Sequence, residues 1–418
     1  MVVLIVVALA AGMVALRWRR RGVPEPAPRP VISERTRASA RAEARRFDLR
    51  EIIEPGLRQP VTADNHASWA RVLSTLKWTN YREPDSLAPL RAMTLQAAWP
   101  EETRRLLLET IYTLQPQELL PEMKAVAATD LNPRHWAMAA AYIRRATGHL
   151  PPAPAAAPES FVNDPRVRAA RAEEREPRAR LARTPPPLRD LLSWDSGGRP
   201  VVFSFQRSDR DFPGRATIRD ARGDWVRQGD GALWSVPQLA RSVSNLPGTI
   251  TNGNTPAGVM GIRELTVART AAIGPTLALT LALPDEYEAW THEDYQRRLP
   301  PSWRAHWPMQ EAWWAGQVGR TEIMAHGTTI DPEWWRGTPF HPLTPSHGCL
   351  TCDEHWSPDT GARLRSDQQS LADAVIRAGG APAWFVVVEI DPPKLPVTPV
   401  SADEVAAHVA DATSGAAE

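Results

Sequence analysis

Apolar and polar positions follow two different periods in the two halves of the chain. Between about Phe47 and Thr147, apolar residues recur every three or four positions behind proline starts, as in "PEETRRLLLETIYTL" and "NPRHWAMAAAYIRRAT". This spacing predicts a succession of short amphipathic helices. From about Leu188, apolar runs such as "PVVFSFQ", "TLALTLAL" and "AWFVVVEI" alternate with Gly, Asp and Pro, which predicts strands. The expected fold class is α+β and multidomain, with a small α-helical domain before a mainly β domain.

The first residues form an uncharged apolar run, "VVLIVVALAAGMVAL" from Val2 to Leu16, which ends at "RWRRR". Its length falls between a signal-peptide core and the roughly 17–25 residues of a full membrane span. We interpret residues 1–21 as an uncleaved N-terminal membrane anchor, with a buried N-terminal helix as the alternative. Arginines directly after such a run favour a cytoplasmic flank, which leaves the start site and the topology open.

Three stretches without a regular apolar pattern divide the chain. Residues 22–46, rich in Pro, Arg and Ala, predict a tether. Residues 151–187 predict a second, Pro/Arg-rich linker that could contain a charged helix. Residues 396–418 are assigned to a C-terminal tail. These boundaries leave an α-helical domain at 47–150 and a β domain at 188–395. The helical domain is either a module that binds a protein partner or serves as a spacer, or simply a small helical domain.

Composition narrows the functional classes. Lys and Arg number 49 against 48 Asp and Glu, so the net charge of +1 provides no basic field and predicts no nucleic-acid partner. Two cysteines cannot build a disulfide framework, so core packing must hold the fold. Many of the 17 tryptophans stand between Asp285 and Gln317, and Trp334 and Trp335 follow. Their rings either stack on a substrate or pin an insertion onto the core.

Both cysteines stand in "SHGCLTC", Ser346 to Cys352, a segment that fits three kinds of chemistry. A Cys-x-x-Cys pair is a redox motif when it opens a helix in a βαβ setting, and no such alternation surrounds this pair. With the two cysteines, His347 and His355 complete a set of four possible zinc ligands, although their spacing is short for one closed tetrahedron. Cys352 alone is a small packing residue, or the partner of Cys349 in a regulatory disulfide.

The third kind of chemistry makes Cys349 a nucleophile, which requires a base or a cation near the thiol. His326 is the candidate base, because Gly327 beside it lets another segment approach closely. Gly348 lets the backbone before the thiol turn its amides toward one point, which predicts an oxyanion hole.

Three signatures occur in order within the β region: "TPAG" at residues 255–258, "HG" at His326 and "SHGCL" at Ser346. Together they resemble the catalytic domain of the L,D-transpeptidases of the YkuD type, over roughly residues 199–390. The resemblance implies that Cys349 is the acyl-accepting nucleophile and His326 the general base. It also implies that the Gly327 carbonyl orients this base.

The same resemblance extends to the residues around the thiol. The implied oxyanion donors are His347, Gly348 and Cys349. The candidate substrate-binding residues are Ser346, Thr351, Trp334 and Trp335. Thr351 stands where the family commonly has Asn or Arg, and the gap between His326 and Cys349 is longer than usual, so donor recognition is expected to differ.

The implied activity is acyl transfer through a cysteinyl thioester, with no cofactor and no metal. The donor would be a peptidoglycan tetrapeptide stem, cleaved before its terminal D-alanine, and the acceptor an amine of a second stem or of a protein. Water as the acceptor would make the enzyme an L,D-carboxypeptidase. A non-catalytic peptidoglycan-binding envelope protein is the alternative from another class. The substrate implies a periplasmic catalytic domain, held at the cell inner membrane by the N-terminal segment.

Overall fold

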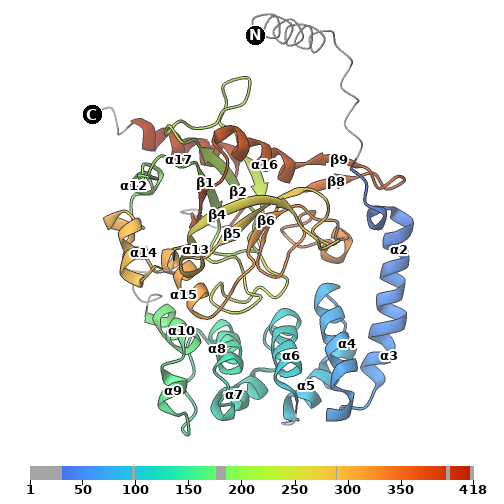
Figure 1. Cartoon of the computed structure of the whole chain (residues 1–418). Coiled ribbons are helices and arrows are strands. Elements are labelled where there is room, and N and C mark those ends of the chain that lie inside the picture. The colour runs from blue at the N-terminus through green and yellow to red at the C-terminus, as the bar shows by residue number, and fades with distance from the viewer. Residues whose placement is uncertain (1–30, 97–98, 176–184, 289, 392–395, 415–418) are drawn as a thin grey trace, which may run out of the picture. The chain divides into compact units, whose positions relative to one another are not determined.

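An eight-stranded sheet forms the centre of the C-terminal half in the computed structural model, which describes residues 31–96, 99–175, 185–288, 290–391 and 396–414 (Figure 1). Its strand order is β3-β2-β1-β10-β4-β5-β6-β7. The strands are β1 (Val201–Gln206), β2 (Gly214–Arg219), β3 (Val236–Gln238), β4 (Gly258–Val267), β5 (Leu277–Ala282), β6 (Met324–His326), β7 (Leu350–Thr351) and β10 (Ala383–Glu389). β1 pairs in parallel with β10, and β6 with β7. The expected combination of helices and sheet is confirmed.

The two edges of this sheet meet, so that it nearly closes on itself. Leu239 follows β3 directly, and its amide donates to the carbonyl of Thr351 at 2.8 Å. The Thr351 amide donates back to the carbonyl of Leu239 at 2.9 Å. Since Thr351 belongs to β7, the last strand in the order, Cys349 lies at the seam between β3 and β7.

Both faces of the central strands are buried. Successive side chains of a strand point to opposite faces, and all six residues of β1 are buried. Val202 belongs to one core cluster and Phe203 to another. Helix α16 (Asp367–Ala378) contributes to the cluster of Val202. Helix α17 (Ala402–Ser414) contributes to the cluster of Phe203, so the predicted C-terminal tail in fact contains a packed helix. Val405 and Val409 are the buried residues of α17, and alanines and polar residues make up most of the rest, so the sequence pattern did not reveal the helix.

The tryptophan-rich insertion packs on the same face as α17. It includes helices α14 (His292–Arg298) and α15 (Glu311–Gln317). Trp290, Trp303 and Trp313 are all buried in the cluster that contains Phe203. These three rings therefore hold the insertion on the sheet and do not face an open groove.

The helices between His66 and Arg175 lie side by side in a row below the sheet in the view of Figure 1, and we call them the helical array. They are α4 (His66–Trp78), α5 (Leu87–Leu95), α6 (Glu101–Leu114), α7 (Leu120–Thr129), α8 (Pro133–Thr147), α9 (Glu159–Val162) and α10 (Pro165–Arg175). Their shared core also takes in Leu246 and Ile250, which belong to the loop between β3 and β4. The array and the sheet domain thus share apolar packing.

The array extends into the stretch that was predicted to be a linker. Phe161 of α9 and Val167 of α10 are buried in the core of the array. From the other side of α10, Arg166 donates to the carbonyl of Val318 at 3.1 Å. The many Arg and Glu residues of α10 conceal its apolar positions in the sequence. Of the predicted linker, residues 176–184 lie outside the described residues.

The predicted tether also differs from the structure where it is described. Helix α2 (Ala38–Phe47) continues through a π-helical segment, η2 (Asp48–Ile53), into α3 (Glu54–Arg58) along one flank of Figure 1. Arg45 of α2 pairs with Asp331 in the loop after β6. The predicted anchor at residues 1–21 lies outside the described residues. Within the described part of the chain, no helix has the length and apolar character needed to cross a membrane.

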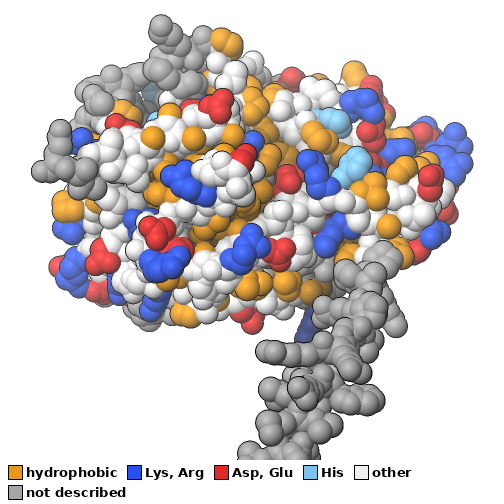
Figure 2. Space-filling view, turned by 90° about the horizontal axis from the view of Figure 1, so that it is seen from above, with side chains coloured by type: hydrophobic (Ala, Val, Ile, Leu, Met, Phe, Trp, Pro, Cys, Tyr) orange, Lys and Arg blue, Asp and Glu red, His pale blue; other side chains and the backbone are white. Residues whose placement is uncertain are grey.

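Charges of both signs are spread over the face of the molecule seen in Figure 2. Lys and Arg side chains alternate there with Asp and Glu side chains, and hydrophobic side chains lie between them. This distribution agrees with the nearly balanced charge of the sequence.

Candidate active site

Strands β6 and β7 bring His326 and Cys349 to the same face of the sheet. The strands are parallel, with Ala325 opposite Leu350 and His326 opposite Thr351. Cys349 directly precedes β7, and the Met324 amide, one position before Ala325, donates to its sulfur at 3.3 Å. Because side chains alternate, Cys349 and His326 share one face, two residues apart on neighbouring strands. At ordinary strand spacings their Cα atoms are about 8 Å apart, which a thiol and an imidazole can span.

The local backbone determines which nitrogen of His326 is available. Its Nδ1 lies 2.5 Å from the carbonyl oxygen of Gly327. A carbonyl oxygen only accepts, so Nδ1 carries the proton and Nε2 keeps its lone pair. Burial lowers the pKa of His326 to about 4, although the bond to Gly327 opposes this shift. The imidazole is therefore neutral at pH 7 and able to accept a proton.

Gly327 is required because a carboxylate occupies the space beside it. A Cβ atom at this position would lie 2.2 Å from the carboxyl carbon of Glu354, in strand β8 (Glu354–Trp356). The Glu354 carboxylate accepts from the Thr328 amide at 3.0 Å, and Trp356 donates its indole N–H to the Thr328 carbonyl at 3.0 Å. β8 thereby fixes the turn whose carbonyl orients His326. The sequence pattern offered no signal for Glu354.

Cys349 carries a free, half-buried thiol. Burial raises its pKa to about 11, and the Met324 amide and the charge of Arg320 oppose this shift. At neutral pH the pair therefore rests as a thiol and a neutral imidazole. Attack on an electrophile requires the proton to move from the sulfur to a base.

Arg320 is a residue of the site that the sequence analysis missed. Its guanidinium is buried and donates to the carbonyls of Gly253 at 3.1 Å, Asn254 at 2.8 Å, and Gly248. A Cβ atom at Gly348 would lie 2.3 Å from its Nη2. Burial lowers the pKa of Arg320 to about 10, so it remains charged at neutral pH. Gly348 thus allows a cation to lie against the peptide next to Cys349.

The turn before Cys349 is held by its own side chains. Gly348 has a φ of 115°, a region that favours glycine, and its amide donates to the Ser346 hydroxyl at 3.1 Å. The Ser346 hydroxyl donates to the Cys349 carbonyl at 2.8 Å. Among the residues that the structure describes, the His347 and Cys349 amides have no hydrogen-bond acceptor. These two amides, rather than that of Gly348, are available to an oxyanion.

The candidate substrate-binding residues occupy different settings. Thr351 is buried, and its hydroxyl donates to the Thr344 carbonyl at 2.6 Å, so it stabilises the turn, as Ser346 does. Trp335 is 2% exposed and packs with Phe340 in a separate apolar cluster. Trp334 is half-buried at the edge of that cluster and retains accessible surface.

The other chemistries considered for the Cys-x-x-Cys segment have no matching geometry. Cys352 is fully buried in the core with Leu350, and Gln238 donates to its sulfur at 3.6 Å. Its side chain projects to the face opposite that of Cys349, and both thiols are free. Across the described ranges, His, Cys, Asp and Glu residues form no group suited to a metal ion. Cys352 accordingly serves as a packing residue here.

Comparison of the chain with family models, with curated proteins and with solved structures finds no match in any of the three. Functional assignment therefore depends on the geometry of the site and on the sequence signatures.

The raised pKa of Cys349 leads to a measurable pH dependence. Alkylation by iodoacetamide is expected to accelerate about tenfold per pH unit between pH 7 and pH 10, because only the thiolate reacts. The rate is not expected to level off in this range, since the pKa of the thiol lies at about 11. Peptide mapping by mass spectrometry would separate Cys349 from Cys352. A plateau near pH 8 would contradict the environment described for this thiol.

Proposed function

We propose that the protein is a peptidoglycan L,D-transpeptidase that uses Cys349 as its nucleophile. The observation that carries the proposal is the pairing of β6 with β7, which places the thiol and the His326 imidazole on one face at the seam of the sheet. The order of the "TPAG", "HG" and "SHGCL" signatures supports the same assignment. A neutral imidazole with Nδ1 bonded to a carbonyl is suited to the role of general base.

In the acylation step, the sulfur of Cys349 attacks the carbonyl carbon of the third stem residue while its proton passes to Nε2 of His326. The amides of His347 and Cys349 would stabilise the oxyanion, with the charge of Arg320 behind them. The tetrahedral intermediate collapses by breaking the bond to the terminal D-alanine. The leaving amine takes the proton from His326, and a thioester remains on Cys349.

In the second step, an acceptor amine attacks the thioester carbonyl and gives its proton to His326. The new amide bond forms as the carbon–sulfur bond breaks, and the proton returns to Cys349. Each proton transfer in the cycle is carried by His326, so the chemistry requires only groups of this chain. Water in place of the amine would release a tripeptide stem, which is the L,D-carboxypeptidase reaction.

This proposal also implies a cellular location for the enzyme. Its substrate lies outside the cytoplasm, so the sheet domain and the helical array would work in the periplasm. The apolar run within residues 1–21 would then anchor the protein in the inner membrane.

Intact-protein mass spectrometry tests the proposal. The purified protein is incubated with a disaccharide tetrapeptide, and the expected product is an adduct on Cys349 equal to the donor minus D-alanine. A cross-linked dimer of stems should follow when an amine acceptor is present, and a tripeptide product when only water accepts. If the protein binds the donor but neither the adduct nor any released D-alanine forms, it is a peptidoglycan-binding protein and the proposal fails.

A further inference from the structure

The helical array contacts the turn that carries Cys349. Trp78, the last residue of α4, lies at a tilt on His347, with ring centroids 4.7 Å apart. On another side, Trp78 meets Trp335 in a T-shaped contact at 6.4 Å. The end of α4 is thereby held against the turn two residues before the nucleophile.

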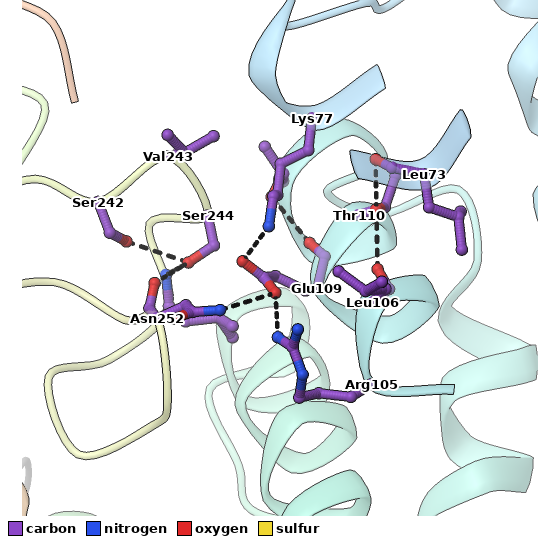
Figure 3. Close-up of polar contacts among 12 residues, drawn as sticks. Leu73, Lys77, Arg105, Leu106, Glu109, Thr110, Ser242, Val243, Ser244 and Asn252 are labelled. Carbon is purple, nitrogen blue, oxygen red and sulfur yellow. Dashed lines mark hydrogen bonds and ion pairs between the residues drawn. The ribbon is translucent and has the colours of Figure 1, made fainter. Parts of the chain in front are cut away.

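A buried charge network next to Trp78 forms the second contact (Figure 3). Glu109 of α6 is fully buried, and its carboxylate pairs with Lys77 and Arg105, which are also buried. The amide side chain of Asn252, from the loop between β3 and β4, donates to the same carboxylate at 3.4 Å. A buried carboxylate is stable only when its hydrogen-bond partners are in place, so this network specifies where Asn252 lies.

The loop that contains Asn252 leads directly to the candidate active site. The Asn252 carbonyl accepts from Ser244 at 2.8 Å, and the next two carbonyls, of Gly253 and Asn254, accept from Arg320. Thr255, in the same segment, donates its hydroxyl to the Gly348 carbonyl at 3.0 Å. A displacement at Asn252 would therefore move both Arg320 and the turn before Cys349.

From these contacts we infer that the α4–α6 edge of the helical array is a positioning element for the nucleophile. Glu109 holds Asn252, and the loop of Asn252 holds Arg320 and Gly348 beside Cys349. Glu109 and Asn252 touch no reacting atom, and Asn252 acts through this loop. The consequence for acyl transfer rests on the proposed function, whereas the consequence for the thiol does not. A spacer or a purely partner-binding module would leave both unchanged.

The substitution Asn252→Asp tests the link, because it faces Glu109 with a second carboxylate. Asn252 has a φ of 58°, which aspartate also adopts, so the backbone should tolerate the change. In the double variant Asn252→Asp/Glu109→Gln, the new amide at position 109 can donate to the new carboxylate at position 252. This reversal keeps the total charge of the network. Asn80→Asp, at another position of positive φ in the array, is the matched control.

For Asn252→Asp we expect kcat of acyl transfer to fall about tenfold at an unchanged KM, since the loop positions the chemistry and does not bind the donor. In the double variant kcat should return to within about twofold of the wild-type value. The control Asn80→Asp should have the wild-type kcat. If Asn252→Asp melts below the assay temperature, Asn252→Gly removes the amide without adding charge and should lower kcat in the same direction. A folded Asn252→Asp variant with wild-type kcat overturns the inference.

Failure of the proposed function would be recognised separately. In that case wild-type protein forms no acyl adduct, and the alkylation rate of Cys349 by iodoacetamide decides the inference. A rate that changes at least about threefold in Asn252→Asp and returns in the double variant supports positioning of the thiol by the array. Equal rates in wild type and Asn252→Asp overturn it.

Discussion

Replacing Cys349 with alanine is expected to abolish acyl transfer, lowering the rate by about 10⁴-fold or more. In the proposed mechanism both half-reactions proceed through a bond to its sulfur, so no general base or oxyanion donor can compensate for its loss. The adduct on the intact protein should disappear together with the cross-linked product. Chromatography of the stem peptides and mass spectrometry of the protein measure the two effects independently.

Cys352 provides a matched control three residues away. It is fully buried in the sheet core and projects to the opposite face. Cys352→Ala should leave acyl transfer near the wild-type rate and lower the free energy of unfolding by about 1 kcal/mol, since it removes one small buried group. Retained transfer in Cys349→Ala, or its loss in a folded Cys352→Ala protein, would be incompatible with Cys349 as the nucleophile.

The elements that could be predicted are those whose own residues reveal their environment. The three- and four-residue spacing at 101–114 and 133–147 corresponds to α6 and α8, and the apolar runs at 201–206 and 383–389 correspond to β1 and β10. The segment from 165 to 175 was assigned to a linker that could contain a charged helix, because its charged residues outnumber the few apolar residues that α10 buries. The spacing of apolar residues and the composition of a segment reveal its buried face only when most of its residues follow the apolar and polar pattern of that element.

The candidate site was predicted in part for a related reason. His326 and Cys349 stand beside glycines. Such short signatures can be recognised in the sequence, because only glycine lets another group approach the backbone this closely. Arg320 and Glu354 have no such mark, since their roles depend on carbonyls and amides that only the fold brings near. The helical array was likewise predicted as helices, but its contact with the loop between β3 and β4 depends on Asn252, which follows Glu109 by 143 positions in the chain. Long-range pairing of this type leaves no periodic trace.

Replacing Arg320 with methionine is expected to affect stability and catalysis together. The carbonyls of Gly248, Gly253 and Asn254 would lose a buried donor, so the free energy of unfolding should fall by about 3 kcal/mol or more. The thiolate of Cys349 would lose a nearby cation, so the pKa of this thiol should rise further. Acyl transfer should fall about 10²-fold, as expected when charge stabilisation of an oxyanion is removed.

Arg219→Met separates the two effects, because Arg219 in β2 is also buried and also donates to backbone carbonyls, those of Leu192 and Trp194. It should lower the melting temperature similarly while leaving acyl transfer per folded molecule within a few-fold of wild type. Arg320→Lys keeps the charge but lacks the fork that reaches three carbonyls, so it should recover part of the transfer rate and little of the stability. If Arg320→Met and Arg219→Met lose transfer to the same degree at equal folded fraction, Arg320 acts on the fold alone. Loss confined to Arg320→Met, with partial return in Arg320→Lys, would assign its charge to the chemistry at Cys349.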